Sequence, residues 1–309
     1  MLFLQSDMWY NECEMFINVT SPRVLKELMA QFGVAPLKKL GQNFLVDGNI
    51  ADKIAAAAAP AGACVLEIGP GFGALTSRLL ARGSEVAAYE IDAGLCRALD
   101  AIFTGEPRFH LFHQDFLKAD INQELGALFG GREIYVSANL PYYITSPCIM
   151  ALLTARLNIR RITVMVQREV ADRLCAAPGS KDYGVLTVAA GFFSAPQRLF
   201  NVSPSCFYPR PEVESAVVQM EIAPQQDMDF EAFMDTVKAL FAMRRKTVKS
   251  NLRTAGLEPQ QTEAVLKAAG IDENARAETL SVRDFIAISR ELKKYINKVR
   301  IYRGKKDFV

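Results

Sequence analysis

An Asn-Leu-Pro-Tyr turn at residues 139–142 directly follows an apolar run that is typical of a buried strand. The Asn139 side-chain oxygen and the Leu140 carbonyl are two hydrogen-bond acceptors, and Pro141 restricts the turn that carries them. Together they could bind both hydrogens of an amino group on a flat ring, and the ring of Tyr142 could stack on it. The turn therefore predicts a site that orients an exocyclic amine. A proline turn whose tyrosines pack on the surface is the simpler alternative.

A glycine-rich loop at residues 69–73 joins a second apolar run to a helix-like segment. Glycines here allow a tight turn and let a ligand lie against the backbone at the start of a helix. The Gly-Pro-Gly-Phe-Gly spacing is one residue short of the dinucleotide-binding pattern, and Glu67 stands just before it. A carboxylate beside the loop favours a cationic or hydroxyl-bearing ligand over a pyrophosphate.

Two more acids, Glu90 and Asp115, stand where the next two strand-like runs end. Glu90 comes about 20 residues after the loop, where a carboxylate can accept hydrogen bonds from both hydroxyls of a ribose. Asp115 could accept from an exocyclic amine. With Glu67 they describe a nucleoside site without phosphates, which fits S-adenosylmethionine. Taken singly, each acid could instead cap a loop.

Short apolar runs alternate with helix-like stretches from residue 63 to residue 167, which predicts a parallel sheet with helices on both faces. Ligands of such sheets bind at the carboxyl ends of the strands. Two further runs, 197–203 and 215–223, have no helix between them and suggest an antiparallel pair at one edge. The expected fold is α/β: the Rossmann-like class I S-adenosylmethionine-dependent methyltransferase fold, with a seven-stranded, mostly parallel sheet.

After residue 225 only helical periodicity remains. We expect a flexible amino-terminal extension over 1–18, a methyltransferase domain over 19–225, a small helical domain over 226–297 and a basic tail over 298–309. Residues 225–309 carry 17 Lys and Arg against 12 Asp and Glu, whereas residues 1–224 carry 19 against 22. This uneven charge suggests a polyanionic partner for the second part of the chain, and a solvated basic face is the alternative.

The six cysteines are scattered without a C-x-x-C pair, and the two histidines lie in one strand-like run. We therefore expect reduced thiols, a cytoplasmic location and no metal site. The start of the chain resembles neither a secretory signal nor a transit peptide, and Met15 could be the true start. No apolar run approaches the roughly 20 residues that a membrane span needs.

The combination of these motifs resembles the ribosomal RNA adenine N6-dimethyltransferase family of the small-subunit (KsgA) type, from Val19 to Asn297. The residues that carry the resemblance are the segments 40–45, 67–71, 90–92, 115–116, 139–142 and 207–211, with Val213 and Ser215. The resemblance implies N6,N6-dimethylation of two adjacent adenosines near the 3′ end of small-subunit (16S) ribosomal RNA during ribosome biogenesis. It also implies S-adenosylmethionine as the methyl donor.

The resemblance further implies which residues form the site. Those implied to bind the cofactor are Gln42, Asn43, Leu45, Glu67, Gly69, Gly71, Glu90, Ile91, Asp115, Phe116 and Asn139. Those implied to be catalytic are Asn139, Leu140, Pro141, Tyr142 and Phe207. Asn43 and Leu45 would cover the donor, and Phe207 would lie against the target base opposite Tyr142. Tyr143 departs from the family, which commonly has Asn there, so the resemblance does not extend to how the pocket rim is held.

The expected mechanism is in-line transfer that depends on positioning and on acceptors aimed at developing positive charge. It needs no general base, because the methylated, ammonium-like product is strongly acidic and releases its proton to water. A first transfer can use both amine hydrogens as anchors, whereas a second finds only one. The aromatic rings should therefore matter more for the second methyl group than for the first.

For RNA contact we expect Lys38 and Lys39 near the donor cover, and a basic group in the helical domain made of Arg244, Arg245, Lys246, Lys249 and Arg253. On one helix, Arg245, Lys249 and Arg253 would share a face at i, i+4 spacing. Such a face supplies phosphate contacts, although exposed arginines on a helix are also ordinary. The expected partner is small-subunit rRNA within a 30S-like assembly particle, with the protein acting as a monomer and without a membrane.

Two other functions share these features. A large-subunit rRNA methyltransferase of the macrolide-resistance type has the same donor site and Asn motif, although the extended carboxyl-terminal domain and the segment 207–215 are closer to the small-subunit type. A non-catalytic ribosome assembly factor could keep the same fold, but the intact Asn139 and acids argue against lost catalysis.

Overall fold

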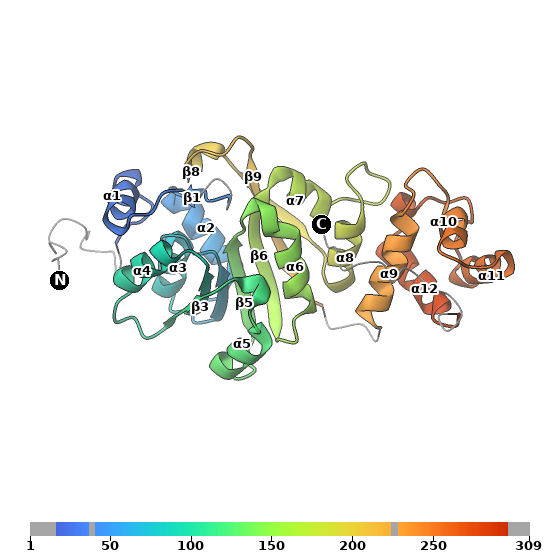
Figure 1. Ribbon diagram of the computed structural model, residues 1–309, viewed down its shortest axis with the longest axis horizontal. Coiled ribbons are helices and arrows are strands. Elements are labelled where there is room, and N and C mark those ends of the chain that lie inside the picture. The colour runs from blue at the N-terminus through green and yellow to red at the C-terminus, as the bar shows by residue number, and fades with distance from the viewer. Residues whose placement is uncertain (1–16, 37–40, 224–227, 296–309) are drawn as a thin grey trace. The chain divides into compact units, whose positions relative to one another are not determined.

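The computed structural model describes residues 17–36, 41–223 and 228–295. Its contacts divide the chain into two compact units (Figure 1). The first unit is Met1–Ala171 with Gln197–Ile222, and the second is Asp172–Pro196 with Ala223–Val309. The boundaries expected from the sequence at residues 18, 225 and 297 stay predictions. Residues 1–16 of the extension expected over 1–18, and the basic tail expected over 298–309, lie outside the described residues.

The first unit is built on a seven-stranded sheet, which confirms the predicted fold. Its strands are β2 (Cys64–Ile68), β3 (Glu85–Glu90), β4 (Phe109–His113), β5 (Ile134–Asn139), β6 (Ile159–Gln167), β7 (Gln197–Val202) and β9 (Ser215–Glu221). They are ordered β4-β3-β2-β5-β6-β9-β7. The first five are parallel, and β9 pairs antiparallel with both β6 and β7, as the two late apolar runs suggested.

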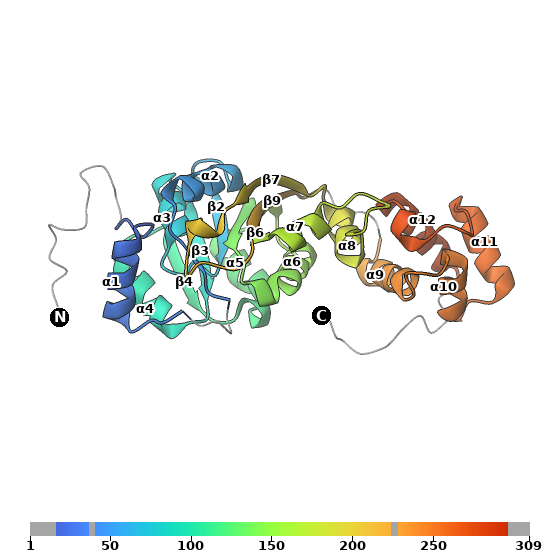
Figure 2. The same ribbon diagram turned by 90° about the horizontal axis from the view of Figure 1, so that it is seen from above.

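Helices connect the parallel strands. They are α3 (Ala74–Ala81), α4 (Ala93–Ile102), α5 (Ile121–Phe129) and α6 (Thr145–Thr154), while α2 (Gly48–Ala58) precedes β2. Figure 2 shows α2 and α6 on opposite sides of the strands. The chain runs from β2 outward to β4 and then returns to place β5 on the other side of β2. This reversal leaves a crevice at the carboxyl ends of β2 and β5, the usual ligand position in such sheets.

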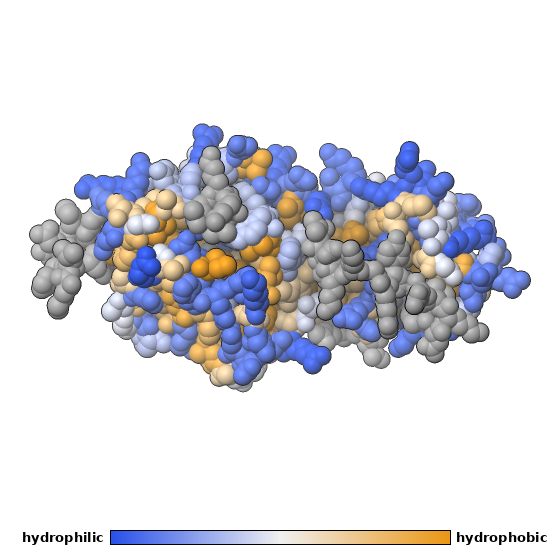
Figure 3. Space-filling model, in the orientation of Figure 1, coloured by the Kyte–Doolittle hydropathy of each residue, from blue (hydrophilic) through white to orange (hydrophobic). Residues whose placement is uncertain are grey.

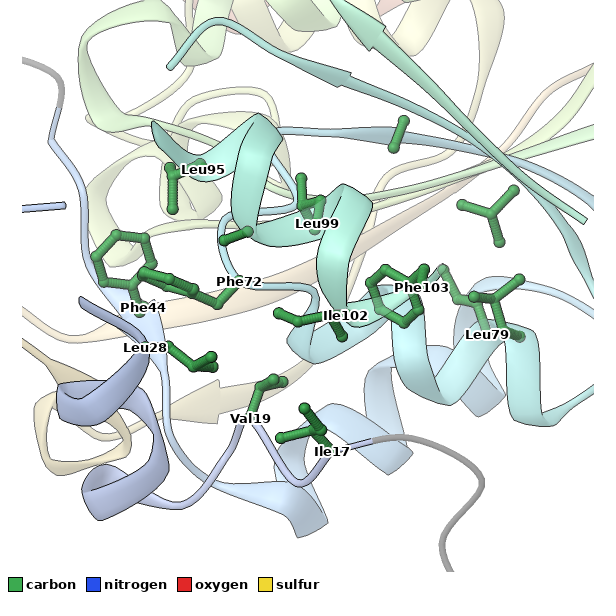
Figure 4. Close-up of a cluster of buried hydrophobic side chains, with 14 of the residues drawn as sticks. Ile17, Val19, Leu28, Phe44, Phe72, Leu79, Leu95, Leu99, Ile102 and Phe103 are labelled. Atoms are coloured by element: carbon green, nitrogen blue, oxygen red, sulfur yellow. The ribbon is translucent and has the colours of Figure 1, made fainter. Parts of the chain in front are cut away.

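A second, two-stranded sheet joins segments that are far apart in the sequence. In it β1 (Phe44–Leu45) pairs antiparallel with β8 (Phe207–Tyr208), and Leu45 lies opposite Phe207. The Phe44 ring packs edge-on against Phe72 of the glycine loop, with ring centroids 5.1 Å apart. Figure 4 shows these two rings in one apolar cluster with Leu28 of α1 (Pro22–Phe32) and with Leu95 of α4. The cluster fixes the segment before β1 beside the sheet.

The second unit is helical. Its described helices include α8 (Val185–Phe193), α9 (Phe230–Phe241), α10 (Val248–Thr254), α11 (Pro259–Ala269) and α12 (Val282–Leu292), while α7 (Arg168–Leu174) crosses the division between the units. Phe192 of α8 packs on Phe233 of α9 with ring centroids 4.4 Å apart, and the buried Tyr183 hydroxyl donates to the Leu280 carbonyl at 2.7 Å. These contacts make α8 part of the helical core.

The surface combines charged and apolar residues. On the face drawn in Figure 3, apolar residues are interspersed among hydrophilic ones. Within the described ranges, no helix has both the length and the apolar composition that crossing a membrane requires.

Candidate active site

An open pocket lies at the carboxyl ends of β2, β3, β4 and β5. The empty space in the pocket and at its open mouth is about 1060 Å³. All eleven residues expected to bind the cofactor line it: Gln42, Asn43, Leu45, Glu67, Gly69, Gly71, Glu90, Ile91, Asp115, Phe116 and Asn139. Three of the residues expected to be catalytic, Leu140, Pro141 and Tyr142, line it as well. The structure thus collects residues from five separate stretches of sequence in one place.

The glycine loop forms the floor of this pocket with backbone rather than side chains. Gly69 and Gly71 adopt φ angles of 67° and 60°, in the left-handed region that glycine favours. The Gly69 N–H donates to the Tyr89 carbonyl at 2.9 Å, which ties the loop to β3. A Cβ on Gly71 would lie 3.0 Å from the Phe44 ring, so a side chain there would push against this ring of β1.

Glu67, at the end of β2, is buried and accepts a hydrogen bond from the Thr76 hydroxyl at 2.7 Å. Burial raises the pKa of Glu67 to about 8, and the Thr76 hydrogen bond only partly opposes this. The carboxyl is therefore mostly protonated at neutral pH. A neutral Glu67 can donate as well as accept, which suits a polar ligand group beside the loop.

Glu90 and Asp115 are already engaged by backbone amides. Glu90 accepts from the N–H groups of Ile91 at 2.9 Å, Asp92 at 3.0 Å and Gly71 at 3.3 Å. Burial raises the pKa of Glu90, and these three N–H groups oppose the rise. Asp115 accepts from the Leu117 N–H at 3.1 Å. Since a carboxylate offers about four lone-pair positions, both acids keep acceptor capacity for hydroxyl or amino groups of a ligand.

Asn139, the last residue of β5, has a side chain of defined orientation. Its Nδ2 donates to the Asn43 carbonyl at 3.0 Å. A carbonyl can only accept, so the nitrogen branch must face Asn43, and Oδ1 is the branch left to accept from a substrate. The Leu140 N–H donates to the Met165 carbonyl of β6 at 3.1 Å, which anchors the start of the turn to the sheet.

Tyr142 and Tyr143 occupy a short 3₁₀ turn after Pro141. The Tyr142 hydroxyl lies 3.1 Å from Ser215 Oγ of β9, and burial raises the pKa of Tyr142. Tyr143 is 53% exposed and lines the pocket at its rim. The two rings therefore differ in freedom: Tyr142 is held at its tip by the sheet, and Tyr143 projects toward solvent.

Phe207 is the expected catalytic residue that the structure does not place among the pocket-lining residues. Its side chain is 4% exposed and packs in an apolar cluster with Leu45, Ile54 and Leu75. The pairing of β1 with β8 puts its backbone opposite Leu45, which does line the pocket. Contact with a bound base would require the ring to turn out of this cluster, so its stacking role stays a prediction.

Arg245 does not share a helix with Lys249 and Arg253, so the expectation that these three form one helical face was wrong. Arg245 lies in the turn between α9 and α10, because Thr247 caps α10 by accepting from the Ser250 N–H at 3.2 Å. In α10, Lys249 forms ion pairs with Glu263 and Glu273, and Arg253 pairs with Glu263 at 3.5 Å. These acids neutralise much of the expected face.

The remaining basic residues are placed as follows. Arg244 donates to the Lys181 carbonyl at 3.2 Å, whereas Arg245 and Lys246 are exposed. Lys38 and Lys39 lie outside the described residues. RNA binding by this group stays a prediction.

Sequence reasoning missed several pocket residues. Val19 and Leu25 reach the lining from the segment around α1, and Phe72 and Tyr89 reach it from the loop and from β3. The apolar spacing of 22–32 signals an amphipathic helix, but nothing local in that stretch indicates where the helix docks.

The chain is similar to known proteins over most of its length. A family model described as ribosomal RNA adenine dimethylase matches residues 36–294. The ribosomal RNA small subunit methyltransferase A of Pelotomaculum thermopropionicum is 44% identical over 286 residues, which are 88% of this chain and 97% of that protein. The protein of the same name from Geobacillus thermodenitrificans is 43% identical over 284 residues, with 89% and 97% covered.

Two solved structures share the fold. A dimethyladenosine transferase from Plasmodium falciparum has a TM-score of 0.70 at 24% identity, covering 81% of this chain and 98% of that one. The 23S rRNA methyltransferase ErmE has a TM-score of 0.64 at 25% identity, covering 81% of this chain and 100% of that one.

Proposed function

The chain belongs to the ribosomal RNA adenine dimethylase family, and from this premise we propose that it dimethylates N6 of two adjacent adenosines near the 3′ end of small-subunit rRNA. One observation carries the proposal: Asn139, bound through Nδ2 to the Asn43 carbonyl, is held in a pocket lined by every residue expected to bind S-adenosylmethionine.

The pocket suits that cofactor by its donor set. Glu90 and Asp115 supply acceptors for ribose hydroxyls and for an adenine amine, and Glu67 lies beside the left-handed Gly69. The carboxylate of Asp115, at the end of β4, disfavours a phosphate group beside it, since like charges would meet at short range. When bound, S-adenosylmethionine supplies an electrophilic methyl group.

The residues of the turn would prepare the target amine. The lone pair of an adenine amine is delocalised into the ring, which makes the nitrogen a poor nucleophile. Two acceptors that bind the two amine hydrogens would orient this lone pair toward the methyl group of the donor. Asn139 Oδ1 and the Leu140 carbonyl are proposed as those acceptors, with the Tyr142 ring stacked on the base. Because these groups are held by the sheet before substrate arrives, little reorganisation is left for the chemical step.

RNA contacts are proposed for the exposed Arg245 and Lys246, with Lys249 and Arg253 contributing where phosphates displace their acidic partners. A substrate within a 30S-like particle, a monomeric enzyme and a cytoplasmic location complete the proposal. The direct test is binding at increasing salt: log Kd should rise with log salt by about 0.7 to 0.9 per phosphate contact. Binding that scarcely weakens with salt would argue against this surface.

The function itself is tested by mass spectrometry of ribosomal RNA from cells with and without the gene, where N6,N6-dimethyladenosine should disappear from the small-subunit RNA alone. A parallel assay offers the purified protein small-subunit particles and large-subunit RNA. Methylation of the large-subunit RNA instead would replace the proposal by the alternative typified by ErmE.

A further inference from the structure

One carboxylate behind the pocket joins the ends of two neighbouring strands. Oε2 of Glu124, in the first turn of α5, accepts from the Tyr89 hydroxyl at 2.7 Å and from Gln114 Nε2 at 2.8 Å. Tyr89 belongs to the end of β3 and Gln114 directly follows β4, and both line the pocket. Glu124 itself is not among the lining residues, so the contacts of a ligand in this pocket are made by its two partners.

The hydrogen bond from Tyr89 to Glu124 is held in place by the packing of the Tyr89 ring. Tyr89 is 1% exposed, and its ring stacks on Phe112 with centroids 4.7 Å apart and meets Phe116 edge-on at 5.6 Å. Burial and the neighbouring Glu124 raise the pKa of Tyr89, so its hydroxyl stays protonated and is a constant donor. A buried hydroxyl without an acceptor is costly, which keeps the Glu124 carboxylate in this position.

The hydrogen bond between Gln114 and Glu124 sets the orientation of the Gln114 side-chain amide. A carboxylate oxygen accepts, so the nitrogen branch of Gln114 must point to Glu124 and the oxygen branch is left for other partners. Gln114 is the residue next to Asp115, which is proposed to accept from the adenine amine of the cofactor. Two neighbouring acceptors match a group that donates two hydrogens, and they oppose a 6-oxo group, which presents only lone pairs.

We propose that Glu124 is a positioning residue that makes the cofactor pocket selective for adenine: it holds the Gln114 amide with its oxygen as acceptor and keeps Tyr89 in place beside Phe116. This inference rests on the proposed function, because it presumes that the pocket binds S-adenosylmethionine by its adenine.

The test compares S-adenosylhomocysteine with S-inosylhomocysteine by titration calorimetry on the full chain. In the second ligand the 6-amino donor of the purine is replaced by a 6-oxo acceptor, and the neighbouring N1 acceptor becomes an N1–H donor. Glu124→Ala should weaken the adenine ligand by about two- to tenfold, the worth of one hydrogen bond, and should leave the 6-oxo ligand less affected. Glu124→Gln should restore selectivity, since its amide oxygen can accept from both partners. Glu231→Ala, which removes an exposed acid from the first turn of α9, is the matched control.

A second variant keeps the test independent of folding defects. Gln114→Met should lower selectivity like Glu124→Ala, and the double variant should show no further loss, because the two residues act as one unit. Equal weakening of both ligands by Glu124→Ala, or additive losses in the double variant, would overturn the inference. If the unaltered chain binds neither ligand, the proposed cofactor itself is wrong; if it binds them and Glu124→Ala keeps its selectivity, only this inference fails.

Discussion

The side-chain amide of Asn139 donates a hydrogen bond to the backbone carbonyl of Asn43 across 96 positions of sequence, at 3.0 Å. The bond links the end of β5 to the segment that leads into β1, and it leaves the Asn139 oxygen as the acceptor in the pocket. The orientation of the central catalytic candidate thus depends on a backbone group from another part of the chain.

Asn139→Ala should lower the rate of methyl transfer by at least about a hundredfold, because it removes a preset acceptor from the site of developing charge. Asn139→Asp keeps the shape but places a carboxylate oxygen against the Asn43 carbonyl, so it should also be impaired. Single-turnover rates on small-subunit particles measure both effects, with thermal unfolding as the control for folding. A rate within threefold of the unaltered enzyme would remove Asn139 from the mechanism.

Substitutions at Tyr142 distinguish the contribution of ring stacking from that of the hydroxyl hydrogen bond. Tyr142→Phe loses only the contact with Ser215 Oγ and should change kcat/KM for RNA by no more than about tenfold, the worth of one neutral hydrogen bond. Tyr142→Ala also loses the ring, and a lost base stack corresponds to about 1–3 kcal/mol. Ser215→Ala should reproduce the effect of Tyr142→Phe. Steady-state kinetics should give a larger loss of kcat/KM for Tyr142→Ala than for Tyr142→Phe or Ser215→Ala. Equal losses for Tyr142→Phe and Tyr142→Ala would mean that the ring does not stack on the base.

Phe207→Ala should raise the ratio of mono- to dimethyladenosine, since stacking matters most when one amine hydrogen has been replaced. The same substitution empties space in an apolar cluster and should cost about 3–5 kcal/mol of unfolding free energy. Phe207→Leu fills more of that space without providing a flat ring and is therefore the informative partner. Nucleoside mass spectrometry gives the ratio, and a ratio unchanged in both variants would contradict the stacking role.

Glu67 should make the stability of the protein fall as pH rises. Its pKa of about 8 in the folded state lies above the value of about 4.3 for an exposed glutamic acid, so the folded state binds this proton more tightly than the unfolded state. Stability from this group is therefore lost between about pH 4.5 and pH 8, by up to about 5 kcal/mol.

Glu67→Gln keeps an oxygen for the Thr76 hydroxyl but does not titrate, so its unfolding free energy should lack this fall. Urea unfolding at several pH values measures the difference, with the exposed Glu231→Gln as control. Parallel pH profiles for the Glu67 variant and the unaltered protein would show that Glu67 titrates normally.

Comparison of Gly73→Ala with Gly62→Ala tests the cost of a steric clash in the glycine loop, because the two glycines have similar backbone angles. Both glycines have positive φ, 84° and 75°, so alanine is strained at each by about 1–2 kcal/mol. A Cβ at Gly73 would lie 2.6 Å from the buried Phe103 ring, whereas a Cβ at Gly62 meets nothing within 4 Å. Gly73→Ala should therefore be less stable than Gly62→Ala by about 1–3 kcal/mol. Equal midpoints in chemical unfolding would mean that the loop yields without cost.

Much of the site could be predicted because its signals are local. The glycine loop, the acids at the ends of β3 and β4 and the turn after β5 each follow an apolar run within a few residues. Parallel strands align their carboxyl ends, so the alternation of strands and helices already implied that these groups would meet. The seven-stranded sheet and its antiparallel edge followed from the same periodicity.

What the tertiary structure decided are the contacts between distant segments. The pairing of Leu45 with Phe207, the buried state of the Phe207 ring and the attachment of Gln114 to Glu124 depend on how packed elements face one another. Arg245 does not lie on the expected helical face, because α10 begins after it, at the Thr247 cap. Sequence periodicity reports which face of an element is apolar, whereas the partner of that face is selected by packing and by the need to pair every buried polar group.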